Sequence, residues 1–284
     1  MLLGPTTTIG MPDCPEGYSV VSGGPYPTNL PVVCERDDGS GDQVVRVGDF
    51  WIDRYEMSVW SDPDCDGTAY GVGSDDYGAV FPDNGNWTTE RYACSVSGVQ
   101  PATWITWFQA QQACSLSGKS LCSNAEWQAA ASGTPDDTTC NVDHGTLEDT
   151  GANAGCVSNW GAMDMVANAG EWVDLWQSHP GWNGDWYNDW STTYGDDIYW
   201  SGGPTATSMP AYGTPGSWRP YSPGFPGNGD DLKEPFGPAA ARRGGHYGDG
   251  TDAGVFALRL SHGPSYWGDG LGARCCMGRE EGVR

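Results

Sequence analysis

Ten cysteines are spread along this chain of 284 residues, and no two of them form a CxxC pair. Zinc sites draw their ligands from such closely spaced pairs, so the pattern argues against zinc. It indicates disulfides that hold long loops together in an oxidising compartment; the alternative is a set of free, buried thiols in a cytosolic protein. Two short-range pairs are favoured, Cys14 with Cys34 and Cys140 with Cys156.

The chain is strongly acidic, with a formal net charge of -24. Such a chain repels phosphate backbones and anionic lipid, which predicts that it binds no nucleic acid and does not insert into membranes. The charge fits a well-solvated acidic surface or a cation-binding role. No apolar run is long enough to span a membrane and no signal peptide is visible, yet the cysteines favour an extracellular or cell-surface location.

The length allows one large domain or two ordinary ones. Residues 1–45, rich in Pro, Gly and Asp, are expected to form an N-terminal extension, and residues 46–284 the main domain. That domain is predicted to begin with a strand or hairpin, because apolar residues nearly alternate with polar ones. The apolar positions are Val45, Val47, Phe50, Ile52 and Tyr55.

Two helices are predicted between residues 101 and 133, each with its own start and stop signal. Thr106 can cap the first helix, and Gly118 ends it. In the second helix, Ser123 and Glu126 form a capping box ahead of an apolar stripe, and Gly133 ends it.

Residues 160–238 contain many aromatic, Gly and Pro residues but no sustained period of 2 or 3.6. This composition predicts a long loop region held by aromatic anchors. Further along the chain, a short apolar strand is predicted from Gly254 to Leu260, between polar and aromatic turns.

Five motifs follow one another along the chain: FWIDRYEMS (50–58), ITWFQAQQAC…GKSLCSNAEWQAAA (105–131), WGAMDMVANAGEW (160–172), RGG (243–245) and GARC (272–275). Together they resemble the formylglycine-generating-enzyme-like family of sulfatase-modifying factors, a branch of the C-type lectin fold. The resemblance covers residues 46–278. It implies an α+β domain with a C-type-lectin-like fold, in which two helices lie beside small antiparallel sheets and much of the chain is irregular loop.

Within that family, the last forty residues resemble the hypervariable region of proteins diversified by retroelements, in which mutable clusters alternate with fixed pieces. The fixed frame here comprises RGG (243–245), AGVFAL (253–258), Leu260, Pro264-Ser265 and GARC (272–275). The resemblance implies a mutable ligand-binding surface, here called the predicted surface, between the frame pieces. Its members are His246, Tyr247, Gly248, Asp249, Asp252, Arg259, Ser261, His262, Tyr266, Trp267, Gly268 and Asp269.

The function that this resemblance implies is binding of a macromolecular ligand, expected to be a protein, in the manner of a receptor or adhesin. The composition of the predicted surface is compatible with that role. Tyr and Trp offer large contact areas, while Ser, Gly and Asp supply adaptable polar contacts, as in antibody paratopes. The alternative is a set of ordinary surface residues beside a core strand.

The resemblance also raises an enzymatic alternative, since formylglycine-generating enzymes oxidise a substrate cysteine with a pair of cysteines five positions apart. Cys275 matches the second of the pair, but the first position is Gly270, and the neighbouring Cys276 points differently. No nucleophile elbow, phosphate loop or zinc-protease motif is present. We therefore expect no enzymatic activity and no required cofactor; a divergent or inactive enzyme of this type is the alternative.

Two sets of oxygen ligands are candidates for structural calcium. Asp62, Asp64 and Asp66 match the first half of a D-x-D-x-D-G calcium loop whose closing Glu is missing; the alternative is a solvated acidic turn. Asn168 and Glu171 match positions where the resembling proteins hold calcium, and there the alternative is a hydrogen-bonded turn.

Calcium at either place predicts that EDTA lowers the melting temperature, because an ion that binds only the folded state stabilises it by mass action. Thermal unfolding with and without EDTA measures the effect. An unchanged melting temperature would assign these residues to a solvated turn and a hydrogen-bonded turn.

Overall fold

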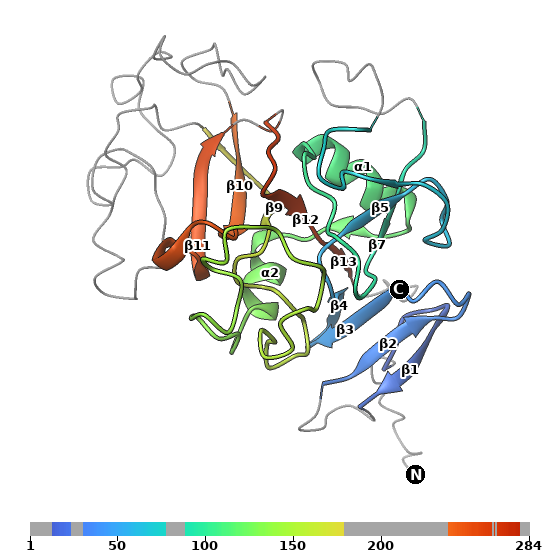
Figure 1. Cartoon of the computed structure of the whole chain (residues 1–284). Coiled ribbons are helices and arrows are strands. Elements are labelled where there is room, and N and C mark those ends of the chain that lie inside the picture. The colour runs from blue at the N-terminus through green and yellow to red at the C-terminus, as the bar shows by residue number, and fades with distance from the viewer. Residues whose placement is uncertain are drawn as a thin grey trace, which may run out of the picture.

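The structure, a computed structural model, describes residues 13–23, 31–77, 89–178, 238–262, 264 and 266–278. Within these residues, two α-helices lie beside sheets of six, four and three strands, joined by much irregular chain (Figure 1). This is the α+β class that the sequence predicts. In the part of the chain so described, no helix is both long and apolar enough to cross a membrane.

The largest sheet contains, in spatial order, β1 (Tyr18–Ser22), β2 (Val33–Arg36), β3 (Gln43–Val47), β4 (Phe50–Asp53), β13 (Cys275–Met277) and β8 (Ser120–Leu121). The antiparallel pair β3 and β4 confirms the predicted hairpin. Val33 of β2 lies opposite Val45 of β3. The sheet therefore continues across the expected boundary between residues 45 and 46.

A second sheet contains, in spatial order, β11 (Gly254–His262), β10 (Pro238–Gly244), β9 (Gly170–Ser178) and β12 (Leu271–Ala273). β11 confirms the predicted apolar strand, although its Phe256 is 45% exposed, whereas the sequence suggests burial. β9 lies where the sequence predicts irregular loop. Its residues from Gly170 to Val173 are all buried, on both faces of the sheet. A strand buried in this way does not show the alternation of apolar and polar residues by which a strand is predicted.

Both predicted helices are confirmed together with their caps. α1 (Trp107–Leu116) begins after Thr106, and α2 (Asn124–Ala130) begins after Ser123, each with a complete capping box. α1 packs against a third, small sheet of β6 (Ala69–Tyr70), β5 (Ser58–Trp60) and β7 (Tyr92–Cys94). The indole of Trp127 on α2 is fully buried in the core.

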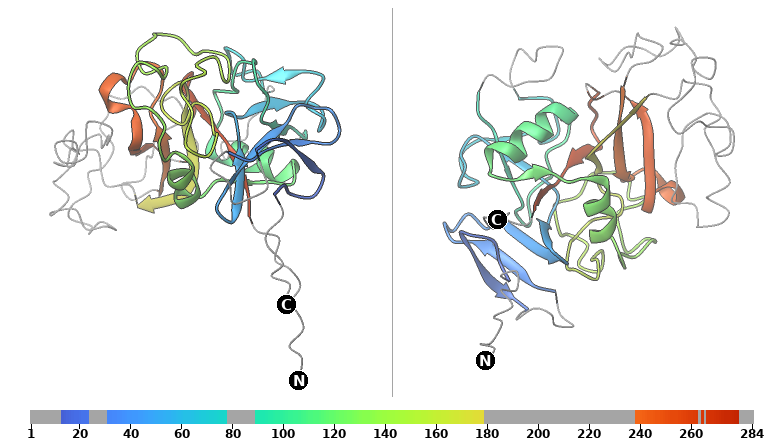
Figure 2. Two further views of the ribbon diagram at one scale, coloured as in Figure 1. Left: turned by 90° about the horizontal axis from the view of Figure 1, so that it is seen from below. Right: turned by 180° about the vertical axis from the view of Figure 1, so that it is seen from behind.

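All ten cysteines form disulfides, and the two predicted short-range pairs are confirmed. The five bonds are Cys14–Cys34, Cys65–Cys94, Cys114–Cys275, Cys122–Cys276 and Cys140–Cys156. The two bonds from β13 join residues 161 and 154 positions apart, and cross-links that close long loops remove the most entropy from the unfolded chain. They fasten β13 between α1 and the start of α2, as the view from behind in Figure 2 shows.

Arg274 stands between β12 and β13, where the chain passes from the four-stranded to the six-stranded sheet. Its side chain is fully buried and forms an ion pair with Glu171 of β9, with 2.7 Å between Nη2 and Oε1. It also donates hydrogen bonds to the backbone carbonyls of Asp53, Arg54 and Met163. One side chain thus ties the two sheets and the loop before β9 together.

Replacing Arg274 by Met should lower the free energy of unfolding by about 3–5 kcal/mol, because the buried Glu171 carboxylate loses its countercharge. Guanidinium-induced unfolding measures this loss. Arg54→Met is the matched control: the Arg54 side chain is only half-buried and donates to Gln43, so a loss below about 1 kcal/mol is expected. Equal losses in the two variants would contradict the central role of Arg274.

Candidate ligand-binding surface

The predicted surface comes from three segments around the β10–β11 edge of the second sheet. The turn after β10 supplies the residues from His246 to Asp252, including a short 3-10 helix, Gly250–Asp252. The end of β11 supplies Arg259 and His262, together with Ser261, whose side chain lies outside the described residues. The loop before β12 supplies residues 266–269.

Side-chain contacts bring these three segments together. Tyr247 Oη donates to Asp269 Oδ2 at 3.2 Å, which joins the turn to the loop. The rings of His262 and Tyr266 have centroids 3.8 Å apart, which joins β11 to the loop. Of the eleven predicted members whose side chains are described, none is buried. The three segments therefore meet, and the members described stay at least partly accessible to solvent.

Backbone hydrogen bonds from the rest of the domain hold these segments in place. In each bond, a main-chain N–H meets a main-chain carbonyl, so the side chain at that position takes no part. The bonds are Tyr247 N to Asn168 O, Gly250 N to Val142 O, Trp104 N to Gly268 O and Gly170 N to Gly270 O, all between 2.8 and 2.9 Å. At these four points the side chains can therefore change while the main-chain positions are kept. Within the turn, the His246 N–H also donates to the Asp249 carboxylate, so that side chain helps to shape the turn.

The RGG motif has a structural role beneath the surface. The buried guanidinium of Arg243 lies over the Trp127 ring and donates to the backbone carbonyls of Phe256 and Ala257. Gly245 adopts a φ of +80°, and a Cβ there would lie 2.6 Å from the Cα of Ala253. The motif is therefore fixed by packing and by backbone geometry, as expected for part of a frame.

A small pocket, partly open to solvent, lies within the surface. Its lining includes His246, Asp249, Asp252 and Arg259 from the predicted set. It also includes Arg242, which the sequence analysis missed because this residue precedes the RGG frame. Arg242 could have been predicted from the alternation of side chains along a strand. Since Arg243 points into the core, Arg242 must point to the other face of the sheet. The site thus contains two arginines from adjacent strands.

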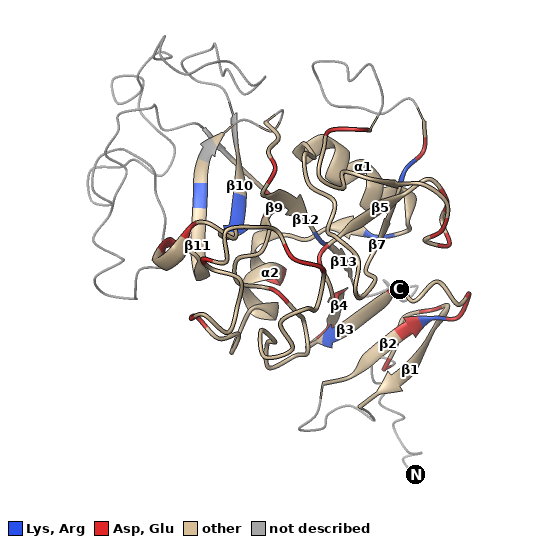
Figure 3. Ribbon diagram, viewed as in Figure 1, with Lys and Arg blue, Asp and Glu red and all other residues tan. Residues whose placement is uncertain are grey.

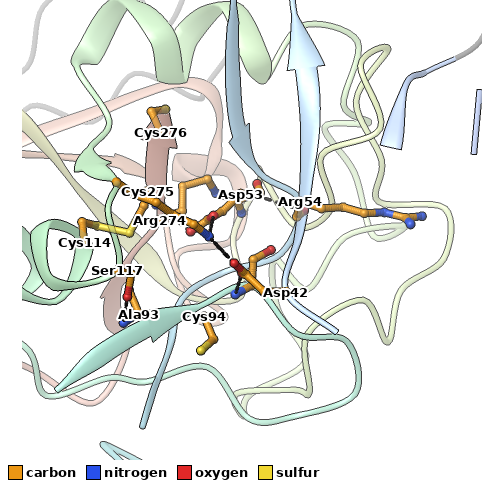
Figure 4. A network of polar contacts seen from close by, with 12 residues as sticks. Asp42, Asp53, Arg54, Ala93, Cys94, Cys114, Ser117, Arg274, Cys275 and Cys276 are labelled. Carbon is orange, nitrogen blue, oxygen red and sulfur yellow. Dashed lines mark hydrogen bonds and ion pairs between the residues drawn. A yellow bond between two sulfur atoms is a disulfide. The ribbon is translucent and has the colours of Figure 1, made fainter. Parts of the chain in front are cut away.

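The cysteine that matches the family's catalytic position is not available as a thiol. Cys275 is fully buried and bonded to Cys114 of α1, and Figure 4 shows this disulfide close to Asp53 and Arg274. The matching first position is Gly270, where a Cβ would lie 3.2 Å from the Cβ of His246. Cys276 pairs with Cys122 instead of with its neighbour.

The calcium candidate formed by Asn168 and Glu171 has other polar partners in the structure. Glu171 pairs with Arg274 and also accepts a hydrogen bond from the indole of Trp127. The Asn168 amide donates to Glu56 at 2.6 Å, and its oxygen accepts from the amide of Asn141 at 2.8 Å. Both side chains are thus used in a hydrogen-bonded turn and a buried ion pair.

The calcium candidate formed by Asp62, Asp64 and Asp66 is an exposed turn. Asp62, Asp64 and Asp66 are all exposed, and Asp66 Oδ1 accepts from the N–H of Gly67 at 2.7 Å. Cys65, between them, is fastened to Cys94 of β7. Among the residues described, no group of three or more His, Cys, Asp or Glu side chains could hold a metal ion. Calcium at either place stays a prediction.

Three buried carboxyl groups surround Arg274 beneath the surface, namely those of Glu56, Asp164 and Glu171. Burial, with the nearby carboxylates Asp164 and Glu171, raises the pKa of Glu56 well above its usual value. Burial likewise raises the pKa of Asp164 to about 6, although this carboxylate accepts a hydrogen bond from the Gly151 N–H. The folded protein therefore holds a proton on Asp164 at a pH where the unfolded chain has already released it.

Because the folded pKa of Asp164 is the higher one, the stability due to this group is present at low pH and is lost as the pH rises through 6. The Asp164→Asn variant should remove this dependence. Between pH 5 and 6.5, the slope of the unfolding free energy should change by up to about 1.4 kcal/mol per pH unit.

Urea unfolding at a series of pH values gives this slope. Asn tolerates the left-handed backbone at position 164, where φ is 56°, so the fold should be kept. Asp137→Asn, at a surface carboxylate whose pKa is lowered by its hydrogen bonds to Thr139, is the control and should leave the slope near pH 6 unchanged. Identical slopes in wild type and Asp164→Asn would contradict the assignment.

The two helices, the small sheets and the long irregular connections define a C-type-lectin-like α+β domain. The family model described as "Sulfatase-modifying factor enzyme 1-like domain" matches residues 11–278, so the chain belongs to this family. The match confirms the fold that the sequence motifs imply.

Solved structures that the chain matches include variants of the Major Tropism Determinant. The M1 variant is 18% identical with a TM-score of 0.48, over 93% of this chain and 55% of that chain. The I1 variant is 19% identical with a TM-score of 0.48, over 88% of this chain and 54% of that chain. The chain thus spans about half the length of these proteins. No curated protein matches it in sequence.

Proposed function

We propose that this protein is a ligand-binding module whose predicted surface contacts a macromolecular ligand, in the manner of a receptor or adhesin. The observation that carries the proposal is the convergence of three separate segments on one accessible surface, joined by Tyr247 with Asp269 and by His262 with Tyr266. Each segment is held through its backbone, so the surface can vary without loss of the fold. Mutable contacts on a fixed scaffold are what a diversified binding protein needs.

Two observations support a binding role over the cysteine-oxidising chemistry of the family. Cys275 lies in a buried disulfide with Cys114, and a disulfide sulfur is neither a thiolate nucleophile nor a thiolate metal ligand. Position 270 carries no side chain. The protein is accordingly proposed to be non-enzymatic and to need no catalytic cofactor.

The ligand is proposed to be a protein outside the cell. The surface offers tyrosine, tryptophan and histidine rings beside short polar side chains, a composition suited to protein recognition. The net charge of -24 disfavours nucleic acid and anionic lipid as ligands. Five disulfides support an oxidising, extracellular location.

Randomising the surface should leave the fold intact and yield binders to an arbitrary protein. A display library that randomises all twelve predicted positions is first sorted for resistance to trypsin, which reports folding, and is then panned against lysozyme as the probe. Most members should pass the first step, because the backbone bonds do not depend on their side chains. Lysozyme binders should be enriched in the second step.

A matched pair of smaller libraries supplies the control for folding. One randomises four surface positions, Tyr247, Gly248, Trp267 and Asp269; the other randomises four frame positions, Arg243, Gly245, Ala253 and Ala257. The frame library should lose trypsin resistance in most members, since these residues are buried or conformationally restricted. Equal losses in both libraries would show that the surface residues are structural, and no enrichment on lysozyme would contradict the binding role.

A further inference from the structure

The turn after β10 is braced by the ring of His246. The main-chain N–H of Gly248 donates to Nδ1 of this ring at 2.9 Å, and the ring nitrogen Nε2 lies 3.3 Å from Oδ1 of Asp249. The other carboxylate oxygen of Asp249 accepts from the main-chain N–H of His246 at 3.0 Å. The imidazole thus closes the turn through both of its nitrogens.

These contacts fix the protonation state of the ring. A ring nitrogen that accepts a hydrogen bond carries no proton, so the neutral ring holds its proton on Nε2, which faces the Asp249 carboxylate. In the doubly protonated ring, Nδ1 also becomes a donor, and it would face the N–H of Gly248. Protonation of His246 therefore breaks the bond to Gly248 and leaves the contact with Asp249.

The charged and titratable groups around the ring come from the turn, from β10, from β11 and from the loop before β12. They are Tyr247, Asp249, Asp252, Arg242, Arg259 and Asp269. Figure 3 shows acidic positions of the turn in red near the basic positions of β10 and β11 in blue. Protonation of the ring is thus opposed by two arginines and favoured by carboxylates.

Burial decides between these opposing effects. The side chain of His246 is only 34% exposed, and burial lowers its pKa below the usual value of 6.5. Asp249 acts in the other direction, while the charges of Arg259 and Arg242 lower the pKa further. The neutral ring, which is the form that accepts from Gly248, is therefore the preferred form in the folded turn.

Loss of the Gly248 bond changes the turn between two backbone anchors. The N–H of Tyr247 stays bonded to the carbonyl of Asn168, and the N–H of Gly250 is held by a carbonyl in the same way. Gly248 has no Cβ, so the peptide before it can rotate once its N–H has lost its acceptor. That peptide adjoins Tyr247, whose hydroxyl reaches Asp269 across the surface. Rotation there changes how the tyrosine is presented.

We propose that His246 is a positioning residue of the ligand-binding surface, whose neutral ring holds the turn in its binding form and whose protonation in mild acid releases it. Because the pKa is lower in the held turn than in the released one, the held form is favoured above pH 6.5 and is lost as the pH falls through the lower value. The last step, weaker binding by a released turn, rests on the proposed function.

NMR spectroscopy of the full chain between pH 8 and 4.5 tests the turn without any ligand. The ring nitrogen shifts of His246 should report a proton on Nε2 at neutral pH and a pKa below 6.5. The amide resonance of Gly248 should move with the same midpoint, because its N–H loses its acceptor. The amide of Gly250, bonded to a main-chain carbonyl, should move far less.

Two variants separate the hydrogen bond from the charge. His246→Asn keeps an acceptor for Gly248, because an Asn side chain can bond the N–H two residues on, but Asn does not titrate. The amide of Gly248 should then keep its neutral-pH shift down to pH 5. His246→Ala offers no acceptor, so its Gly248 amide should resemble the acid form of the wild type at every pH.

His144→Asn is the matched control. The His144 side chain is also 34% exposed and lies 3.0 Å from a carboxylate, that of Glu148, but it is not part of the predicted surface. This variant should leave the titration of the Gly248 amide unchanged.

A lysozyme binder from a library that keeps residues 246–249 and randomises the other predicted positions connects the turn to binding. One pH unit below the His246 midpoint, about nine-tenths of the rings are protonated, so the affinity should be up to about 10-fold weaker than at pH 7.5. The same clone with His246→Asn should lose this part of the pH dependence. Titration of lysozyme itself is common to both clones.

Three results would overturn the inference: a Gly248 amide that does not follow the His246 titration, a His246 pKa at or above 6.5, or equal pH dependence in the clone and its His246→Asn version. Each leaves the proposed function standing if the libraries yield lysozyme binders. Conversely, a Gly248 amide that titrates as expected, without any binder from the libraries, would place the failure in the proposed function.

Discussion

The ion pair between Arg274 and Glu171 is the contact on which the arrangement of the molecule depends. Arg274 lies at the step from β12 to β13, so the residue that joins the two larger sheets in sequence also joins them in space. Glu171 connects it to α2 through the indole of Trp127. Since two buried charges are costly unless paired and hydrogen-bonded, these elements can form only in one relative position. The predicted surface lies at the edge of the four-stranded sheet, whose position the Arg274–Glu171 ion pair fixes.

The disulfides and the ion pair act on different states of the chain. The bonds from Cys114 to Cys275 and from Cys122 to Cys276 restrict the unfolded chain, because they close very long loops. The Arg274 network specifies which folded arrangement is reached. Neither requires any side chain of the predicted surface. A domain stabilised in this way keeps its fold when that surface changes, which suits a binding protein with an exchangeable site.

Local signals predicted the parts of the fold that depend on neighbours in sequence. Thr106 and Ser123 mark their helices because capping is a contact over three residues. β9 escaped prediction because its first four residues are all buried, which removes the strand alternation there, and because its pairing partners β10 and β12 come much later in the chain. For the site, family motifs located the surface residues. Arg242 was missed because it precedes the RGG frame, and it joins Arg259 at the pocket only through the pairing of β10 with β11, seventeen positions later.

The chain order of these elements has a consequence for how sequence changes in the surface are tolerated. β12, Arg274, Cys275 and Cys276 are all translated after the last surface residue, Asp269. A substitution within the surface leaves them intact, whereas an insertion or deletion that shifts the reading frame there removes two disulfides and the buried ion pair at once. Such a product cannot complete either large sheet. Folding therefore acts as a reading-frame check, in which only correctly translated variants become stable proteins.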